Sequence, residues 1–175
     1  MIILLTGPPG SGKTTAARAT VDALAQRGLV VKGILTGEVR APAGHRVGFR
    51  LEPIGGEPRT MAHRDFVSRH RVGRYGVDVE IIDYVCDTAI SARALADADV
   101  VVIDEVGKME CLSGRFVGAV ERVLATKPRV LCTIAERGEG LIAELKARMD
   151  VDIFELAPAT RDALPAELAR RLTSR

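Results

Sequence analysis

A glycine-rich segment follows directly after a short apolar run, IILL, near the start of the chain. Residues 7–15 read GPPGSGKTT. The spacing from Gly7 to Gly12, followed by Lys13 and Thr14, completes the pattern G-x-x-x-x-G-K-[ST] of a phosphate-binding loop. Glycines allow backbone conformations that a Cβ would forbid, so that successive N–H groups can point at phosphate oxygens. The segment therefore predicts a site for a phosphorylated ligand.

The residues on either side of this loop have the patterns that such a site requires. Residues 2–5 are typical of a buried strand, and residues 14–27 of an amphipathic helix that Gly28 ends. The helix N-terminus adds its dipole to the attraction for anions. A strand, turn and helix that bind nothing are the alternative, which the complete context disfavours. The expected nucleotide-binding residues of the loop are Gly7, Pro8, Pro9, Gly10, Ser11, Gly12, Lys13, Thr14 and Thr15.

Two side chains of the loop have chemistry of their own. Lys13 is expected to reach the β- and γ-phosphates, where charge changes during phosphoryl transfer, so it counts as a catalytic residue. The hydroxyl of Thr14 is expected to ligate Mg²⁺. Mg²⁺ is therefore the predicted cofactor.

Length and composition indicate a single domain that spans residues 1–175, with 47% hydrophobic and 27% charged residues, as in soluble globular proteins. The net charge of +2 and the 3% of aromatic residues argue against a nucleic-acid or anionic-membrane partner. No apolar run approaches the length of a membrane span, so we expect a cytoplasmic protein, and a monomer. The three cysteines, Cys86, Cys111 and Cys132, lack zinc-site spacing and are interpreted as small buried hydrophobic residues.

The rest of the chain alternates between β-rich and amphipathic segments. Strands are predicted at residues 29–36, 46–51, 59–62, 99–105, 129–134 and 151–156. Helices are predicted at residues 78–97, 116–125, 141–149 and 163–172. This alternation predicts an α/β fold, a three-layer α/β/α sandwich with a mainly parallel sheet, into which residues 46–62 insert an antiparallel hairpin.

A dense cationic cluster occupies residues 64–75, RDFVSRHRVGRY. One interpretation is a solvated loop. The other is that one or two of its arginines face a triphosphate. The sequence leaves both interpretations open.

Two adjacent carboxylates follow the most apolar strand. Residues 100–103 are all β-branched and are typical of a central parallel strand, at whose carboxyl end Asp104 and Glu105 emerge. Asp104 is predicted to hold Mg²⁺ with Thr14. Glu105 should point to the other side of the strand, where it can reach a water in line with the γ-phosphate. The alternative for Glu105 is an ordinary surface carboxylate at a strand end.

The turn after these carboxylates extends the candidate site. Gly107 permits a tight turn, and Lys108 either points back toward phosphate, pairs with Glu105 or Glu110, or is simply exposed.

Five segments together resemble the THEP1 family of nucleoside-triphosphatases in order and spacing. They are GPPGSGKTT, LTGEVR at residues 35–40, HRVGFRL at 45–51, VGRYGVDV at 72–79 and VVIDEVGKME at 101–110. The resemblance extends over essentially the whole chain, through the TRD at residues 160–162. It implies a RecA-like variant of the P-loop NTPase fold and slow, Mg²⁺-dependent hydrolysis of ATP, GTP, CTP, UTP and TTP to the diphosphate and phosphate, with little discrimination among bases.

The same resemblance implies a second wall of the nucleotide site and roles within it. The wall comprises Val101, Val102, Ile103, Asp104, Glu105, Val106, Gly107 and Lys108. By this carry-over Thr14 and Asp104 hold the metal, and Glu105 acts on the attacking water.

The transition state of such a reaction accumulates charge on the γ-phosphoryl oxygens, so a second cation beside Lys13 is expected. The candidates are Arg40, Arg46, Arg71, Arg137 and Arg161. Arg137 is preferred as the catalytic arginine because it follows a predicted strand and should emerge on the ligand side of the sheet.

Two other classes of function use the same loop. A small-molecule or nucleoside kinase is the first alternative, disfavoured because the Asp104-Glu105 pair supplies a base for water. A nucleotide-dependent switch or nucleic-acid-associated ATPase is the second, weakened by the low net charge and few aromatic residues.

Overall fold

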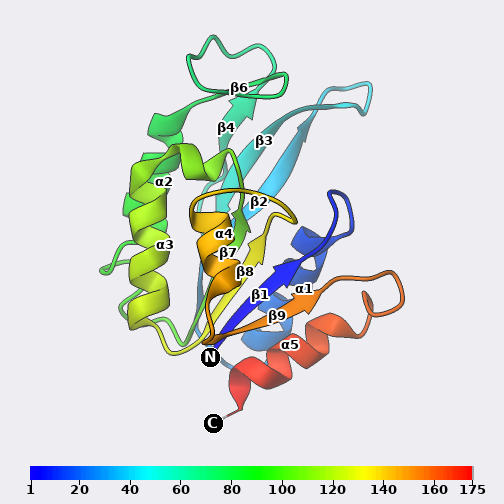
Figure 1. Cartoon of the computed structure of the whole chain (residues 1–175), viewed down its shortest axis with the longest axis vertical. Coiled ribbons are helices and arrows are strands. Elements are labelled where there is room, and N and C mark those ends of the chain that lie inside the picture. Colours follow the sequence, from blue (N-terminus) through cyan, green and yellow to red (C-terminus); the bar gives the residue numbers. More distant parts are fainter. Residues whose placement is uncertain (175) are drawn as a thin grey trace.

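The computed structural model describes residues 1–174 and contains a nine-stranded sheet in the order β5-β6-β4-β3-β2-β7-β8-β1-β9 (Figure 1). Its strands are β1 (Ile2–Thr6), β2 (Val31–Arg40), β3 (Arg46–Pro53), β4 (Arg59–His63), β5 (Arg71–Val72), β6 (Tyr75–Val77), β7 (Val100–Val106), β8 (Val130–Ile134) and β9 (Val151–Glu155). Its helices are α1 (Lys13–Ala25), α2 (Val79–Ala89), the 3₁₀ turn η1 (Glu110–Leu112), α3 (Gly114–Thr126), α4 (Leu141–Ala147) and α5 (Leu164–Thr173).

One half of the sheet is parallel and carries the candidate site. The pairs β2–β7, β7–β8, β8–β1 and β1–β9 are all parallel, so the carboxyl ends of these strands meet at one edge. Strand β8 lies between β1 and β7. The glycine-rich loop after β1 and the carboxylates of β7 therefore share an edge, as the sequence predicted, and one strand separates them.

The other half of the sheet is antiparallel and is larger than the predicted hairpin. Strands β3, β4, β6 and β5 extend the sheet beyond β2, and two of them, β5 and β6, lie in or next to the segment interpreted as a loop. Strands of two and three residues are too short for an alternating pattern to be recognised. Their pairing with β4 decides their conformation, so the predicted antiparallel insertion is present and extends beyond residues 46–62.

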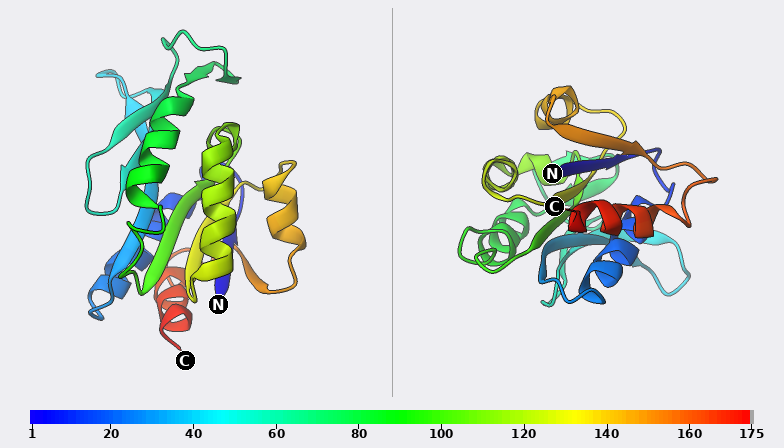
Figure 2. Two further views of the ribbon diagram at one scale, coloured as in Figure 1. Left: turned by 90° about the vertical axis from the view of Figure 1, so that its left-hand side faces the viewer. Right: turned by 90° about the horizontal axis from the view of Figure 1, so that it is seen from below.

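Helices cover both faces of the sheet, which confirms the three-layer α/β/α architecture (Figures 1 and 2). Helices α1 and α5 pack over one face in a core that includes Leu24 and Leu168. Helices α2, α3 and α4 pack over the other face in a core that includes Ile82 and Phe116. Neighbouring residues of β1 alternate between the two cores, as expected for a strand that is buried on both faces.

Two predicted boundaries differ from the structure. Helix α2 ends at Ala89, whereas the sequence predicted a helix to residue 97. Ile90 and Leu95 are both fully buried in the turns that follow, and the Ser91 hydroxyl accepts a hydrogen bond from the Ala94 amide at 3.2 Å. Local side-chain bonding of this kind competes with the helix, although the apolar residues still reach the core. Strand β2 is longer than predicted, because pairing with β3 carries it to Arg40.

Within residues 1–174, each helix is too short or too polar to cross a bilayer. Cys86 and Cys132 are buried free thiols, as the sequence predicted, and Cys111 is half-buried. Burial raises the pKa of both buried thiols to about 12.

Candidate active site

The loop between β1 and α1 has the backbone conformation that its glycines predict. Gly7, Gly10 and Gly12 have φ angles of 153°, 78° and 102°, in the region that other L-residues rarely adopt. A Cβ on Gly7 would also lie 3.0 Å from the Ser11 hydroxyl and 3.2 Å from the Leu156 carbonyl oxygen. Replacement of these glycines would therefore strain or displace the loop.

Lys13, the first residue of α1, folds back over the loop. Its Nζ donates hydrogen bonds to the carbonyl oxygens of Gly7 at 3.0 Å and Pro8 at 3.3 Å, and the residue is only 7% exposed. The ammonium group is thus held inside the loop, where the sequence placed the β- and γ-phosphates.

Ser11 presents a buried hydroxyl inside the same loop. Its Oγ has no hydrogen-bond partner among residues 1–174. A buried hydroxyl without a partner costs free energy, which a phosphate oxygen or a bound water would recover. This polar atom fits a loop that binds an anion.

Asp104, at the end of β7, is fully buried and bound by three threonines. Its Oδ1 accepts hydrogen bonds from the hydroxyls of Thr14 at 3.3 Å and Thr133 at 2.5 Å. Its Oδ2 accepts from the Thr36 hydroxyl at 2.8 Å and the Thr36 amide at 3.1 Å. The predicted pair of Thr14 and Asp104 is therefore in contact, although 90 residues separate them in the sequence.

The donor set at Thr14 and Asp104 fits a magnesium ion. Mg²⁺ is a hard cation that prefers oxygen ligands and binds through one or two protein oxygens together with phosphate and water. The hydroxyl and the carboxylate supply two such oxygens beside the loop that would hold the phosphates.

Thr36 and Thr133 were missed as site residues. Both belong to strands that flank β7: Thr36 lies in β2, two residues beyond the part that pairs with β7, and Thr133 lies near the carboxyl end of β8. Their only sequence signal is a hydroxyl near the end of a β-rich run, and the strand order was needed to connect them to Asp104.

Glu105 lies beside the turn that Gly107 makes. A Cβ on Gly107 would lie 3.4 Å from Glu105 Oε1 and 2.8 Å from Glu110 Oε2, so both carboxyl groups crowd this turn. Burial raises the pKa of Glu105, an effect that the nearby Asp104 carboxylate reinforces and the Lys13 ammonium opposes. The pKa of Glu105 therefore depends on the charges of both Lys13 and Asp104.

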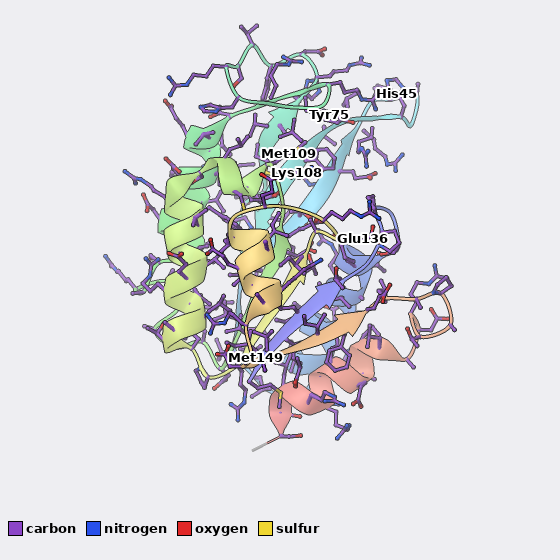
Figure 3. The ribbon with its side chains drawn as sticks, in the orientation of Figure 1. His45, Tyr75, Lys108, Met109, Glu136 and Met149 are labelled. Carbon is purple, nitrogen blue, oxygen red and sulfur yellow. The ribbon has the colours of Figure 1, made fainter. Side chains whose placement is uncertain are left out.

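Glu110, in η1, was not predicted as a site residue. It is 5% exposed, and burial, together with the nearby Glu105 and Asp104 carboxylates, raises its pKa to about 8. Lys108 is exposed and forms no ion pair with Glu105 or Glu110, so the pairing interpretation for Lys108 is not realised. Lys108 and Met109 lie just beyond β7, at the same end of the sheet as Glu136 (Figure 3).

Three of the five candidate arginines contact groups outside the glycine-rich loop. Arg40 and Arg46 both pair with Glu38, and Arg46 also donates to the Tyr75 hydroxyl at 3.3 Å. Arg71 donates to the Arg74 carbonyl oxygen at 3.0 Å. The cationic cluster around Arg71 belongs to the antiparallel end of the sheet, where five strands lie between β6 and β1.

The other two arginines lie in loops at the carboxyl edge of the parallel strands. Arg137 is exposed in the connection from β8 to α4. Its neighbour in sequence, Glu136, is labelled in Figure 3. Arg161 is exposed in the connection from β9 to α5, and a Cβ on Gly12 would lie 3.4 Å from its Cδ. The Arg161 side chain therefore lies beside Gly12 of the loop.

Comparison with known proteins finds relatives that match this chain over nearly its whole length. A family model described as NTPase matches residues 2–169. The nucleoside-triphosphatase THEP1 of Thermofilum pendens is 41% identical over 98% of this chain and 94% of its own length. The crystal structure of THEP1 from Aquifex aeolicus superposes with a TM-score of 0.88 at 32% identity, covering 99% of this chain and 100% of that one.

A second solved structure has the same fold. The solution structure of a human cancer-related nucleoside triphosphatase superposes with a TM-score of 0.80 at 31% identity, covering 99% of this chain and 98% of that one. These matches extend over nearly the full chain and bear out the resemblance seen in its motifs. The chain therefore belongs to the THEP1 family of nucleoside-triphosphatases and is a hydrolase that acts on nucleoside triphosphates.

Proposed function

We propose that the protein hydrolyses ATP, GTP, CTP, UTP and TTP to the diphosphate and phosphate with Mg²⁺, at the edge of the sheet where β1 and β7 end. The observation that carries this proposal is the 3.3 Å hydrogen bond between the Thr14 hydroxyl and Asp104 Oδ1. It joins the phosphate-binding loop to the carboxylate strand, with Lys13 and Glu105 as the adjacent residues on either side.

Phosphate binding is assigned to the loop. Its backbone N–H groups and the Lys13 ammonium would receive the phosphate oxygens, and the Ser11 hydroxyl is a further available donor. Thr14 and Asp104 would hold Mg²⁺, which when bound neutralises charge on the β- and γ-phosphates. Thr36 and Thr133 orient the Asp104 carboxylate for this task.

Glu105 is assigned to the attacking water. It would accept the proton of a water in line with the γ-phosphate, which makes the oxygen a better nucleophile. The raised pKa of Glu105, caused first by burial, makes it a stronger base than an exposed glutamate. The carboxylate form is still required for this role, and the Lys13 ammonium favours that form.

Arg137 is assigned to the charge that develops on the γ-phosphoryl oxygens. It follows β8, which lies between β1 and β7, so its loop leaves the sheet between the phosphate loop and Glu105. A variant Arg137→Ala is expected to lose at least about tenfold in kcat, because cations at this position stabilise the transition state selectively. Unchanged turnover in Arg137→Ala would remove this assignment.

The chemistry of the assigned side chains supports hydrolysis of all five nucleoside triphosphates. Lys13, Thr14, Asp104 and Glu105 would act on phosphate, metal or water, which all nucleoside triphosphates share. None of these four side chains is assigned a contact with the base, so none of them would distinguish one base from another.

The test is phosphate release from the five nucleoside triphosphates, with Mg²⁺ and after its removal by a chelator. We expect release from all five within about tenfold of one another, and loss of release without the metal. A kinase would instead release little phosphate alone and transfer it to an added nucleoside or small-molecule acceptor. Acceptor-dependent turnover, or strong preference for one base, would contradict the proposal.

A further inference from the structure

The connection from β9 to α5, residues 156–163, packs directly against the phosphate-binding loop. A Cβ on Gly12 would have Arg161 Cδ at 3.4 Å and Leu156 Cδ2 at 3.8 Å, and a Cβ on Gly7 would have the Leu156 carbonyl oxygen at 3.2 Å. Figure 1 shows the loops after β1 and β9 at the same end of these two strands. This connection therefore forms one wall beside the loop.

The strand order fixes which end of a bound triphosphate this wall would meet. Asp104 and Glu105 belong to β7, which lies on the β8 side of β1, and Arg161 follows β9, which lies on the opposite side. Metal and water act at the β- and γ-phosphates, and the loop amides hold the α- and β-phosphates. With its γ-phosphate toward β7, the nucleotide must extend its nucleoside toward β9.

Hydrogen bonds hold the backbone around Arg161 in place, whereas its side chain is exposed to solvent. The amides of Thr160 and Arg161 both donate to the Ala157 carbonyl oxygen at 3.0 Å, and the Leu156 amide donates to the Thr6 carbonyl oxygen at 2.8 Å. The Arg161 side chain is 55% exposed, and its ion pair with Asp162, at 3.6 Å, is to a carboxylate that is 96% exposed. The guanidinium group is therefore available to a ligand without the loss of a buried partner.

We propose that Arg161 is the nucleoside-binding residue of this site, and that its guanidinium plane stacks on the nucleobase beside the phosphate-binding loop. This inference rests on the proposed function and adds a contact to the part of the substrate that Lys13, Asp104 and Glu105 do not address. A planar guanidinium stacks on any π-face, because the contact does not use the hydrogen-bonding edge of the base. Arg161 thus provides affinity for every nucleoside, and this affinity differs between bases only as far as purine and pyrimidine rings differ in stacking strength.

The experiment compares ATP, UTP and inorganic tripolyphosphate, which has the phosphates but no nucleoside. Equilibrium binding is measured by calorimetry for the native chain, Arg161→Ala and Arg161→Lys, and turnover of ATP and UTP is measured beside it. Arg170→Ala is the matched control, since Arg170 is also an exposed arginine of this region and pairs with Glu167 on α5.

We expect Arg161→Ala to weaken ATP binding roughly tenfold and UTP binding less, because stacking strength grows with the size of the ring system. Tripolyphosphate binding and kcat should stay within about twofold of the native values. Arg161→Lys should resemble Arg161→Ala, since lysine keeps the charge but lacks the planar face. Arg170→Ala should match the native chain.

Three results would overturn the inference. Equal weakening of tripolyphosphate and ATP would make Arg161 a phosphate ligand. A fall in kcat without a change in nucleotide affinity would make it a transition-state residue. Full retention of affinity in Arg161→Ala would leave it without a role in binding. The binding arm does not require turnover, so failure of hydrolysis in the native chain would count against the proposed function and not against this contact.

Discussion

Asp104 is held by hydroxyl groups from Thr14 in α1, Thr36 in β2 and Thr133 in β8, so its orientation depends on elements that are far apart in the sequence. Removal of one donor would leave a buried carboxylate with fewer partners, and a hydrogen bond to a charged group contributes about 1.5–3 kcal/mol. The arrangement stabilises the fold and aims a metal ligand at the same time.

We predict that Thr133→Val, which keeps the side-chain shape, lowers the free energy of unfolding by about 1.5–3 kcal/mol in urea denaturation. It should also weaken Mg²⁺–ATP binding by about tenfold or more, as changes behind a metal ligand commonly do. Thr126→Val is the control, because Thr126 is exposed at the end of α3. Identical stability and metal affinity in Thr133→Val would show that this hydroxyl is not needed.

Glu110 leads to a prediction about pH. Its pKa is about 8 in the folded chain and 4.5 for the ordinary group, so between these values the folded state binds the extra proton. The stability that Glu110 contributes is therefore fully present below about pH 4.5 and is lost as the pH rises toward 8. The free energy of unfolding changes by about 1.4 kcal/mol for each pKa unit between the folded and unfolded values.

We predict that Glu110→Gln, which stays neutral, removes this loss. Its free energy of unfolding, relative to the native chain, should rise steadily between pH 5 and 8 in denaturant titrations. Glu121→Gln, on the surface of α3, should instead run parallel to the native chain. Parallel curves for Glu110→Gln would mean that Glu110 titrates normally in the fold.

From the sequence, Thr14 and Asp104 were candidates for one site, because a motif locates Thr14 and an apolar strand locates Asp104. The two side chains are in contact in the structure, but the threonines that also bind Asp104 were not predicted. Thr36 and Thr133 lie beside Asp104 because their strands flank β7 in the sheet. Glu110 lies near Glu105 because the turn at Gly107 brings the two carboxyl groups together. Local patterns do not contain that information.

Among the strands, the close approach of β2 to β7 requires the absence of a side chain at Gly33. It has a φ of 134°, and a Cβ there would lie 1.8 Å from the carbonyl oxygen of Val102, its partner in the ladder. Because this neighbour is backbone, the clash cannot be relieved by a side-chain rotation. The pairing that places Thr36 beside Asp104 therefore requires glycine at this position.

We predict that Gly33→Ala lowers the free energy of unfolding by about 3 kcal/mol or more, since the strands must separate or the backbone must strain. Gly118→Ala is the matched control in α3, where a Cβ would have no atom within 4 Å. That control should gain about 0.5–1 kcal/mol from helix propensity. Thermal or urea unfolding of both variants checks the contrast, and a neutral Gly33→Ala would contradict it.

Elements with a strong hydrophobic pattern were predicted well, and elements with a weak pattern were not. The buried strands β1, β7 and β8 have apolar runs that mark them clearly, and their observed pairing confirms that they are parallel. Strands β5 and β6 have two and three residues, and α2 ends early because the following turns bury their own apolar residues. In both cases tertiary contacts decided the local structure.

At the scale of the whole molecule, one continuous sheet connects the two apolar cores. We propose from this that residues 1–175 unfold as a single cooperative unit, as the sequence suggested for one domain. Circular dichroism and intrinsic fluorescence should report the same midpoint in urea. Separate midpoints for the parallel and antiparallel halves would contradict a single unit.

Ligand binding should stabilise the whole chain through linkage. Mg²⁺–ATP at 100 times its Kd is expected to raise the free energy of unfolding by about 2.7 kcal/mol, because it binds only the folded loop. Lys13→Ala should lose most of this gain, since the Lys13 ammonium lies inside the loop. A thermal shift titration measures both, and an equal gain in Lys13→Ala would show that nucleotide binds elsewhere.

We propose that Glu105 activates the attacking water at a site that Lys13, Thr14 and Asp104 form together. The most direct test is phosphate release by Glu105→Gln, measured beside its equilibrium affinity for Mg²⁺–ATP, with Glu121→Gln as the control. We expect kcat to fall by about 10²- to 10⁴-fold while nucleotide affinity stays within about threefold of the native chain. Turnover that survives in Glu105→Gln would contradict it and assign the base to another group.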